Sequence, residues 1–228
     1  MNKKFLIVNL IAFLLILVGD IFYITTSALL VKGLTSVGFV ALGLFNLICV
    51  LKTGTDKKKF SIIMFAGLCF GMLGDILLEI EFITGAVLFA VGHVLYFIAY
   101  CFLQKFDYKD IVAGLIIFVP SMLFIVLAPI FDFGGNLLKI LCVVYALFIS
   151  FMLGKSIANL IKEKNLLNIL ICVGSSLFFF SDLMLLLNVF ANLFSLAGVL
   201  CLITYYPAQC LLAFALLITQ KTENKKIN

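Results

Sequence analysis

Three ionisable side chains lie deep inside long apolar stretches of this 228-residue chain, where they could carry out acid–base chemistry. Asp75 stands in GMLGDILLEI, Asp182 in FFFSDLMLLL, and His93, the single histidine, in AVGHVLYFIAY. A carboxylate at the centre of a membrane span costs roughly 2.5 to 3.5 kcal/mol, so such residues usually face the protein interior or a wet cavity. We therefore interpret Asp75, Asp182 and His93 as candidate catalytic residues.

Two carboxylates can divide the work of an acid and a base. A protonated carboxyl group can donate a proton, while an ionised one stabilises a developing cation or takes a proton from water. Glycoside hydrolysis uses such a pair to pass through an oxocarbenium-like transition state. We expect Asp75 and Asp182 to form an acid/base pair in which either can be the donor. His93 would hydrogen-bond to one of them or orient the water.

Further polar side chains fall in the same apolar segments and are candidates for substrate binding or for orienting the acids. Gly67, Gly71, Asp75 and Glu79 follow one another at intervals of four. Small residues at this spacing let a neighbouring helix approach closely, so this stripe should face protein. A single Tyr or Gln in a span usually makes only an interhelical hydrogen bond of about 0.6 kcal/mol. The substrate-binding candidates are Lys32, Glu79, Tyr96, Tyr205, Tyr206 and Gln209.

Other polar residues favour structural roles. Asp20 lies near the expected end of the first span and Lys32 lies in the loop expected after it, which predicts an ion pair at the surface. Glu81 and Asp132 are expected to be solvated loop charges. The seven Cys form no C-x-x-C pair and are interpreted as packing residues. The sequence contains no H-E-x-x-H or Cys/His ligand set, so we expect neither a metal nor a cofactor.

The elements that must position these residues are membrane-spanning helices. Hydrophobic residues make up 65% of the chain and charged residues 12%, far from the averages of a soluble domain. About 20 apolar residues cross a bilayer, and continuous runs of this length favour α-helices over barrel strands. The fold class is therefore all-α, a single domain over residues 1–228. Its eight expected spans are 5–23, 35–51, 61–78, 83–103, 111–130, 137–154, 166–187 and 194–218.

The distribution of Lys predicts the orientation. With the amino terminus inside, only Lys32 and Lys139 of the 16 basic residues fall outside. Lys concentrates in cytoplasmic loops, so both termini are expected to be cytoplasmic, and the basic balance does not indicate nucleic acid. The Lys residues assigned to cytoplasmic segments are Lys3, Lys4, Lys52, Lys57, Lys58, Lys59, Lys105, Lys109, Lys155, Lys162, Lys164, Lys221, Lys225 and Lys226.

Four sequence segments, in order along nearly the whole chain, carry a resemblance to a known family. They are GMLGDILLE, GAVLFAVGHVLYFIAY, GSSLFFFSDLMLLLN and TYYPAQ. Together they resemble the YhhN-like lysoplasmalogenase family. VKGLTS is similar to the Lys-Pro that opens that family's second helix, although Gly33 stands where Pro is usual.

The resemblance implies hydrolysis of the vinyl ether bond of lysoplasmalogens to a fatty aldehyde and glycerophospho-ethanolamine or glycerophospho-choline. The expected partners are the lysophospholipid substrate and membrane lipids, and Lys32 would hold the phosphate. A Lys-rich chain without Arg suggests a bacterial cytoplasmic membrane. The alternative is a proton- or cation-coupled transporter, since buried acids and a histidine also serve as relays. Spans five and six, almost without polar groups at mid-depth, argue against it.

Overall fold

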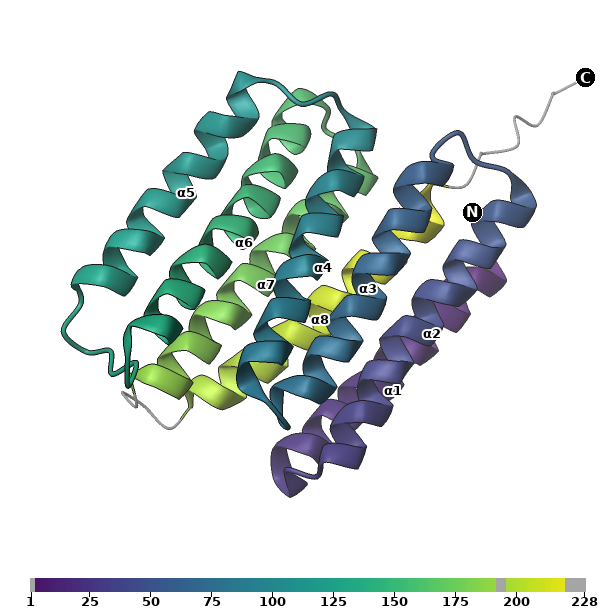
Figure 1. The fold of residues 1–228 in the computed structure, drawn as a ribbon. Coiled ribbons are helices and arrows are strands. Elements are labelled where there is room, and N and C mark those ends of the chain that lie inside the picture. The colour runs from purple at the N-terminus through teal and green to yellow at the C-terminus, as the bar shows by residue number, and fades with distance from the viewer. Residues whose placement is uncertain (1–2, 192–195, 220–228) are drawn as a thin grey trace, which may run out of the picture.

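The computed structural model describes residues 3–191 and 196–219, which form eight α-helices (Figure 1). Each helix is long and apolar enough to cross a membrane, so the chain is an all-helical, multi-pass membrane protein. The helices are α1 (Lys3–Thr26), α2 (Leu29–Thr53), α3 (Lys58–Leu78), α4 (Phe82–Leu103), α5 (Tyr108–Leu127), α6 (Asn136–Lys162), α7 (Leu166–Phe190) and α8 (Ala197–Ile218).

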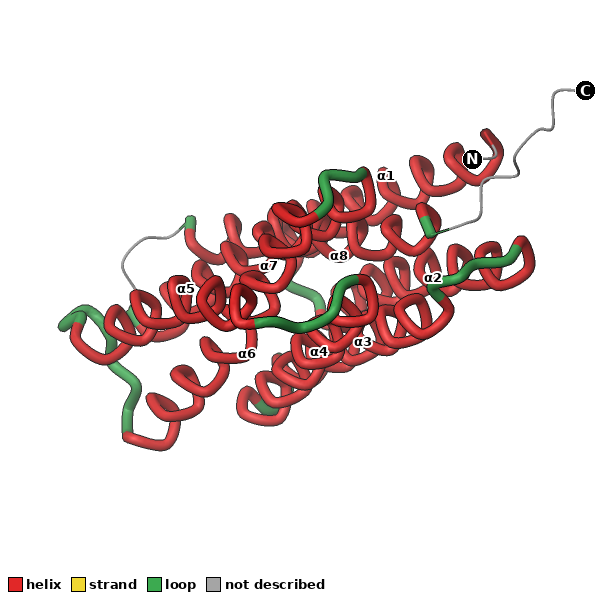
Figure 2. The backbone as a smooth tube through the Cα atoms, turned by 90° about the horizontal axis from the view of Figure 1, so that it is seen from above, coloured by secondary structure: helices red, strands yellow, loops and turns green. Residues whose placement is uncertain are grey.

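The helices alternate in direction, and short connections join them (Figures 1 and 2). α8 lies at the centre of one half and packs against α1, α2, α3 and α7. α6 links the two halves through α4 and α7, while α5 packs against α6 alone among the described helices. This arrangement surrounds the middle of α3, α4, α7 and α8 with other helices. α3, α4 and α7 carry the candidate catalytic residues, and α8 carries three of the substrate-binding candidates.

Glycine allows close approach where two helices pack backbone against backbone. A Cβ atom added to Gly154 of α6 would lie 2.5 Å from the backbone nitrogen of Gly114 in α5. A Cβ atom at Gly67 of α3 would lie 2.5 Å from the ring of Tyr96 in α4. The absence of side chains at these positions lets helices pack at short separation, as small residues do in membrane bundles.

α2 and α6 extend furthest beyond their predicted spans, because Lys residues assigned to loops lie within them. α2 begins at Leu29 and includes Lys32, whose ammonium is 2.7 Å from Glu79. α6 continues to Lys162 and includes Lys155, which is 2.7 Å from Asp110. The side chains of Lys155 and Asp110 are both completely buried. An ion pair lowers the cost of placing a charge in apolar surroundings, so these Lys residues do not mark helix ends.

The prediction of a surface ion pair between Asp20 and Lys32 is wrong. Asp20 is buried in α1, and its Oδ1 atom has no hydrogen-bond partner among the described residues. Lys32 instead pairs with Glu79 at the end of α3. The physical reason is that the first turn of α2 directs the Lys32 ammonium to Glu79, beside the ring of Tyr23 in α1, and not to Asp20. Glu81 and Asp132 are exposed in loops, as predicted.

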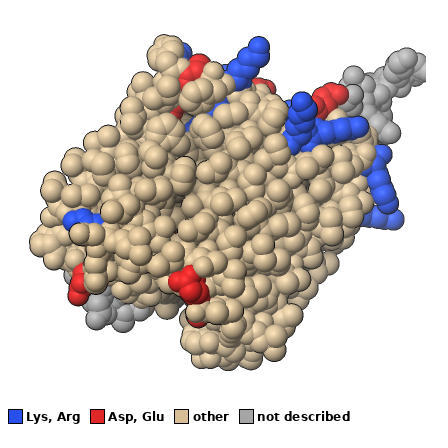
Figure 3. Space-filling model, in the orientation of Figure 1, with Lys and Arg blue, Asp and Glu red and all other residues tan. Residues whose placement is uncertain are grey.

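The helix count places the start of α1 and the end of α8 at the same end of the molecule (Figure 1). On the face shown in Figure 3, most Lys atoms gather at this end, while the opposite end carries few. Which end faces the cytoplasm stays a prediction from the positive-inside rule. Lys221, Lys225 and Lys226, which contributed to that prediction, lie outside the described residues.

Candidate active site

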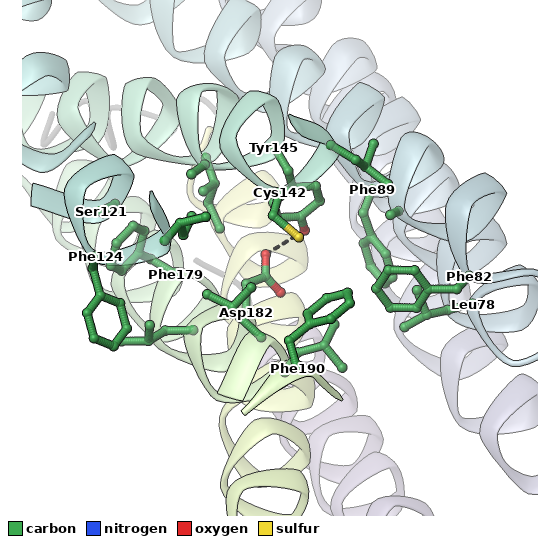
Figure 4. A pocket seen from close by; sticks show the side chains of 18 of the residues that line it. Leu78, Phe82, Phe89, Ser121, Phe124, Cys142, Tyr145, Phe179, Asp182 and Phe190 are labelled. Carbon is green, nitrogen blue, oxygen red and sulfur yellow. Dashed lines mark hydrogen bonds between the residues drawn. The ribbon is translucent and has the colours of Figure 1, made fainter. Parts of the chain in front are cut away.

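An apolar pocket of about 300 Å³ opens between α4, α5, α6 and α7 (Figure 4). Its wall consists mainly of aromatic and aliphatic side chains, and its few polar groups include Tyr145 and Asp182. Apolar pockets with few polar groups bind hydrocarbon and orient it through those groups. Residues that line it include Phe82, Phe89, Phe124, Phe179, Phe190 and Pro120.

A second pocket, of about 280 Å³, lies on the other side of Asp182 and is more polar than the first; it is called the polar pocket below. It is lined by residues of α1, α2, α3, α4, α7 and α8 and by Glu79 just after α3. Four residues line both pockets: Leu78, Phe89, Asp182 and Leu185. Of these, only Asp182 is ionisable, so it stands at the boundary between an apolar and a polar space. The polar residues of the second pocket include Tyr23, Lys32, Asp75, Glu79, Ser181 and Tyr205.

Asp182 is held by two donors on neighbouring helices. The hydroxyl of Tyr145 in α6 donates to Oδ2 of Asp182 at 2.6 Å, and Nε2 of His93 in α4 lies 3.2 Å from the same oxygen. The Tyr145 oxygen is also 2.8 Å from Nε2 of His93. Oδ1 of Asp182 has no such partner in the described part of the chain and turns away from Tyr145 in Figure 4. One oxygen of the carboxylate is thus anchored and the other is available to a bound molecule.

The geometry around His93 favours the tautomer with hydrogen on Nε2. Both potential acceptors, Tyr145 and Asp182, face Nε2, while Nδ1 is buried without a hydrogen-bond partner among the described residues. A neutral imidazole carries one N–H group, and a buried donor without an acceptor is costly. His93 therefore acts as a neutral donor toward Asp182 and Tyr145.

Asp75 faces the polar pocket from α3 and contacts a hydroxyl group of α2. The Ser36 hydroxyl lies 2.6 Å from Oδ2 of Asp75 and 3.0 Å from the carbonyl oxygen of Lys32. The Tyr206 hydroxyl of α8 lies 3.4 Å from the Ser36 oxygen. All of these groups are buried. Asp75 is thus the end of a hydroxyl chain that runs from α8 through α2 to the pocket.

A second chain of hydrogen bonds supports Tyr205. The hydroxyl of Tyr96 donates to Oε1 of Gln209 at 2.9 Å, and the Gln209 amide donates to the Tyr205 hydroxyl at 3.0 Å. Gly71 of α3 makes room for the Gln209 amide. Tyr205 lines the polar pocket, whereas Tyr96, Gln209 and Tyr206 line neither pocket. They lie behind it and can orient the groups in front of them.

Glu79 lies at the outer part of the polar pocket, where three helices meet. Its Oε1 atom accepts hydrogen bonds from the Lys32 ammonium at 2.7 Å and the Tyr23 hydroxyl at 2.8 Å. Burial raises the pKa of the Glu79 carboxyl, but the hydrogen bond and charge of Lys32, with the Tyr23 hydroxyl, outweigh it and hold the pKa below its ordinary value. Glu79 therefore remains an anion at neutral pH.

The structure brings most of the predicted residues together around these pockets. Asp75 and Asp182, from α3 and α7, line the same polar pocket, and His93 contacts Asp182. Sequence reasoning missed Tyr145, although it is a polar side chain near the middle of the sixth span. It also missed Ser36, which follows Lys32 by one helical turn and shares its face. The description of span six as lacking polar groups at mid-depth does not hold at Tyr145.

Among the described residues, no group of three or more His, Cys, Asp or Glu side chains is arranged to hold a metal ion. The polar groups at the pocket boundary are two carboxylates, one imidazole and several hydroxyls. Such an arrangement can transfer protons and stabilise a cation at the junction of an apolar and a polar chamber.

The fold and site define a multi-pass helical membrane protein in which a carboxylate in contact with the histidine lies between an apolar and a polar pocket. Comparison with family models identifies the group of proteins more closely. The chain belongs to the YhhN family, the lysoplasmalogenase family, whose model matches residues 27–216. Comparison with curated proteins and with solved structures found no match. The matched range includes all the predicted site residues.

Proposed function

We propose that the protein hydrolyses the vinyl ether bond of lysoplasmalogens within the membrane. The products would be a fatty aldehyde and glycerophospho-ethanolamine or glycerophospho-choline. Membership of the YhhN family supports a lysoplasmalogenase-type activity. The observation that carries the proposal is that Asp182 lines both pockets. In a lysoplasmalogen the vinyl ether bond joins a hydrocarbon chain to a polar head, so it would lie beside Asp182.

The reaction adds one water molecule. Protonation of the alkene carbon farther from the ether oxygen gives an oxocarbenium ion, and water adds to the carbon next to that oxygen. The resulting hemiacetal loses a proton and expels the glycerol oxygen, which is protonated, so the aldehyde and the alcohol form together. The protein must therefore supply a proton donor, a negative charge near the cation and a base for the water.

Asp182 is best suited to be the ionised partner. Tyr145 and His93 both donate toward its Oδ2 atom, and hydrogen bonds to the charged form favour that form. Its unpartnered Oδ1 would face the oxocarbenium carbon and then accept a proton from the attacking water. His93 and Tyr145 would hold the carboxylate in this position.

Asp75 is then the proton donor. Its neighbour Ser36 has one hydroxyl hydrogen but two oxygens within reach, the Lys32 carbonyl at 3.0 Å and Oδ2 of Asp75 at 2.6 Å. If Ser36 donates to the carbonyl, a protonated Asp75 can donate to the Ser36 oxygen, and both contacts are satisfied. This arrangement supports a protonated Asp75 in the resting protein.

The direct test is aldehyde release by purified protein in detergent. Incubation with 1-alkenyl lysophospholipid should yield fatty aldehyde and the glycerophospho-alcohol in equal amounts. The matched 1-alkyl lipid, which has a saturated ether, should yield none, because it cannot form the oxocarbenium ion by protonation. Folded protein that releases no aldehyde above a protein-free control would refute the proposed activity.

A further inference from the structure

The polar pocket carries an anionic group that the hydrolytic chemistry does not use. Both recorded hydrogen bonds to the Glu79 carboxylate fall on Oε1, and the described residues provide no hydrogen bond to Oε2. The Glu79 side chain is 41% exposed, whereas that of its partner Lys32 is 6% exposed. Glu79 therefore presents an open carboxylate oxygen to the pocket, and the more buried Lys32 lines the same pocket.

The charges of the pocket make an added cation favourable. Its lining includes three carboxyl groups, of Asp75, Glu79 and Asp182, and one amino group, of Lys32. With Asp75 protonated, as in the proposed mechanism, the pocket holds two carboxylates and one ammonium. A ligand with only a phosphate would leave Glu79 uncompensated and would be repelled by it. A ligand with a phosphate and an ammonium would satisfy both members of the Lys32–Glu79 pair.

We propose that Oε2 of Glu79 binds the primary ammonium of an ethanolamine head group while Lys32 binds the adjoining phosphate. This inference rests on the proposed function for the identity of the lipid. The Lys32 ammonium has three N–H donors, and one of them is directed to Glu79. Because two carbons separate phosphate from ammonium in ethanolamine, the two groups can reach neighbouring partners such as Lys32 and Glu79.

The contacts of Lys32 already show that this corner accepts a primary ammonium. The Lys32 nitrogen lies 2.7 Å from Oε1 of Glu79 and 5.5 Å from the centroid of the Tyr23 ring. A carboxylate with an aromatic face beside it is a favourable environment for a cation. A trimethylammonium group has no N–H donor and cannot approach a carboxylate oxygen this closely. The site should therefore prefer ethanolamine to choline.

The experiment measures binding apart from hydrolysis. Three 1-alkyl lysophospholipids of equal chain length, with ethanolamine, choline or glycerol on the phosphate, are titrated against the full-length protein in a nonionic detergent. The dissociation constant is obtained from the concentration dependence of the thermal unfolding midpoint, since a ligand that binds the native state raises it. We expect the ethanolamine lipid to bind about tenfold more tightly than the choline lipid, and the glycerol lipid to bind most weakly.

Glu79→Gln should remove the preference for ethanolamine and bring the three dissociation constants within about threefold of one another. Glu81→Gln is the matched control, because it removes the same charge from the same loop at a residue that lines neither pocket. It should leave the preference unchanged. Equal binding of the ethanolamine and choline lipids by the unmodified protein would overturn the inference, and that comparison needs no variant to fold.

Failure of this inference and failure of the proposed activity give different results. The saturated lipids cannot be hydrolysed at the vinyl ether position, so their binding does not depend on catalysis. An ethanolamine preference without aldehyde release would support the head-group site and refute the proposed hydrolase activity. Aldehyde release without a head-group preference would support the hydrolase activity and refute the head-group site.

Discussion

The hydroxyl of Tyr145 donates a 2.6 Å hydrogen bond to Oδ2 of Asp182, and this bond joins α6 to α7 at the boundary of the two pockets. The same Oδ2 atom lies 3.2 Å from Nε2 of His93. Three helices therefore fix one carboxylate where an apolar chamber meets a polar one. The Tyr145–Asp182 hydrogen bond thus involves the sixth span in the candidate site, which its sequence does not suggest.

Tyr145→Phe should lower kcat by about 10- to 100-fold, because a hydrogen bond to a charged group contributes roughly 1.5 to 3 kcal/mol. KM should change little, since the ring that lines the apolar pocket is retained. Tyr100→Phe is the control, because it removes a buried hydroxyl that hydrogen-bonds to Ser175, and Tyr100 lines neither pocket. Turnover of Tyr145→Phe within twofold of the unmodified protein would exclude a positioning role.

Asp75→Asn and Asp182→Asn should each reduce aldehyde release by at least about 100-fold, the lower end of the usual contribution of acid–base catalysis. Asn keeps the shape of the side chain but can neither donate an acidic proton nor carry a negative charge. Size-exclusion profiles of both variants should match that of the unmodified protein. Near-normal turnover in either variant would remove that residue from the mechanism.

Ala146→Leu should shorten the alkenyl chains that the protein accepts. Ala146 lies in the wall of the apolar pocket, so a larger side chain at this position would reduce the pocket volume of about 300 Å³. For the longest chains, kcat/KM should fall by about tenfold relative to short ones, since a displaced methylene in an apolar pocket is worth roughly 1 to 3 kcal/mol. The same substitution at exposed Ala41 of α2 should leave the chain-length profile unchanged. A uniform loss across all chain lengths would contradict this function of the pocket.

Asp110 and Lys155 form a buried ion pair at one end of α5 and α6. Replacing one residue of the pair should reduce the free energy of unfolding more than replacing the other. Asp110→Asn leaves the completely buried Lys155 without a counter-ion, which should lower the free energy of unfolding by about 3 to 5 kcal/mol. Lys155→Met should cost less, because Asp110 keeps its 3.2 Å contact with Lys162. Thermal unfolding in detergent compares the two variants. Equal loss of stability would show that Lys162 does not compensate for Lys155.

The number of helices could be predicted from the sequence because each apolar run is long enough to span a membrane. The ends of α2 and α6 could not, because Lys32 and Lys155 resemble loop residues until their partners are known. Their partners lie elsewhere in the sequence: Glu79 directly follows α3, and Asp110 is in α5. Such pairing depends on tertiary structure, which cannot be predicted from the hydrophobic periodicity of a single helix.

The candidate site could be predicted in part for a related reason. Asp75 and Asp182 stand out because carboxylates are costly in a span. Tyr145 does not stand out, since a Tyr in a span is ordinarily a packing residue, and only its distance from Asp182 distinguishes it. Asp20 does not stand out either. A carboxylate near a helix end is expected to meet solvent or a cation, but Asp20 is buried and its Oδ1 atom has no hydrogen-bond partner among the described residues.

Pro120, Ser121, Phe124 and Ile125 of α5 form the outer wall of the apolar pocket, and α5 packs against no described helix except α6. A hydrocarbon tail in the surrounding bilayer is therefore separated from the pocket by one helix that has a single neighbour. Sideways displacement of that helix would break only the α5–α6 interface. For the proposed lipid hydrolase, this geometry favours entry of the substrate past α5, within the plane of the membrane.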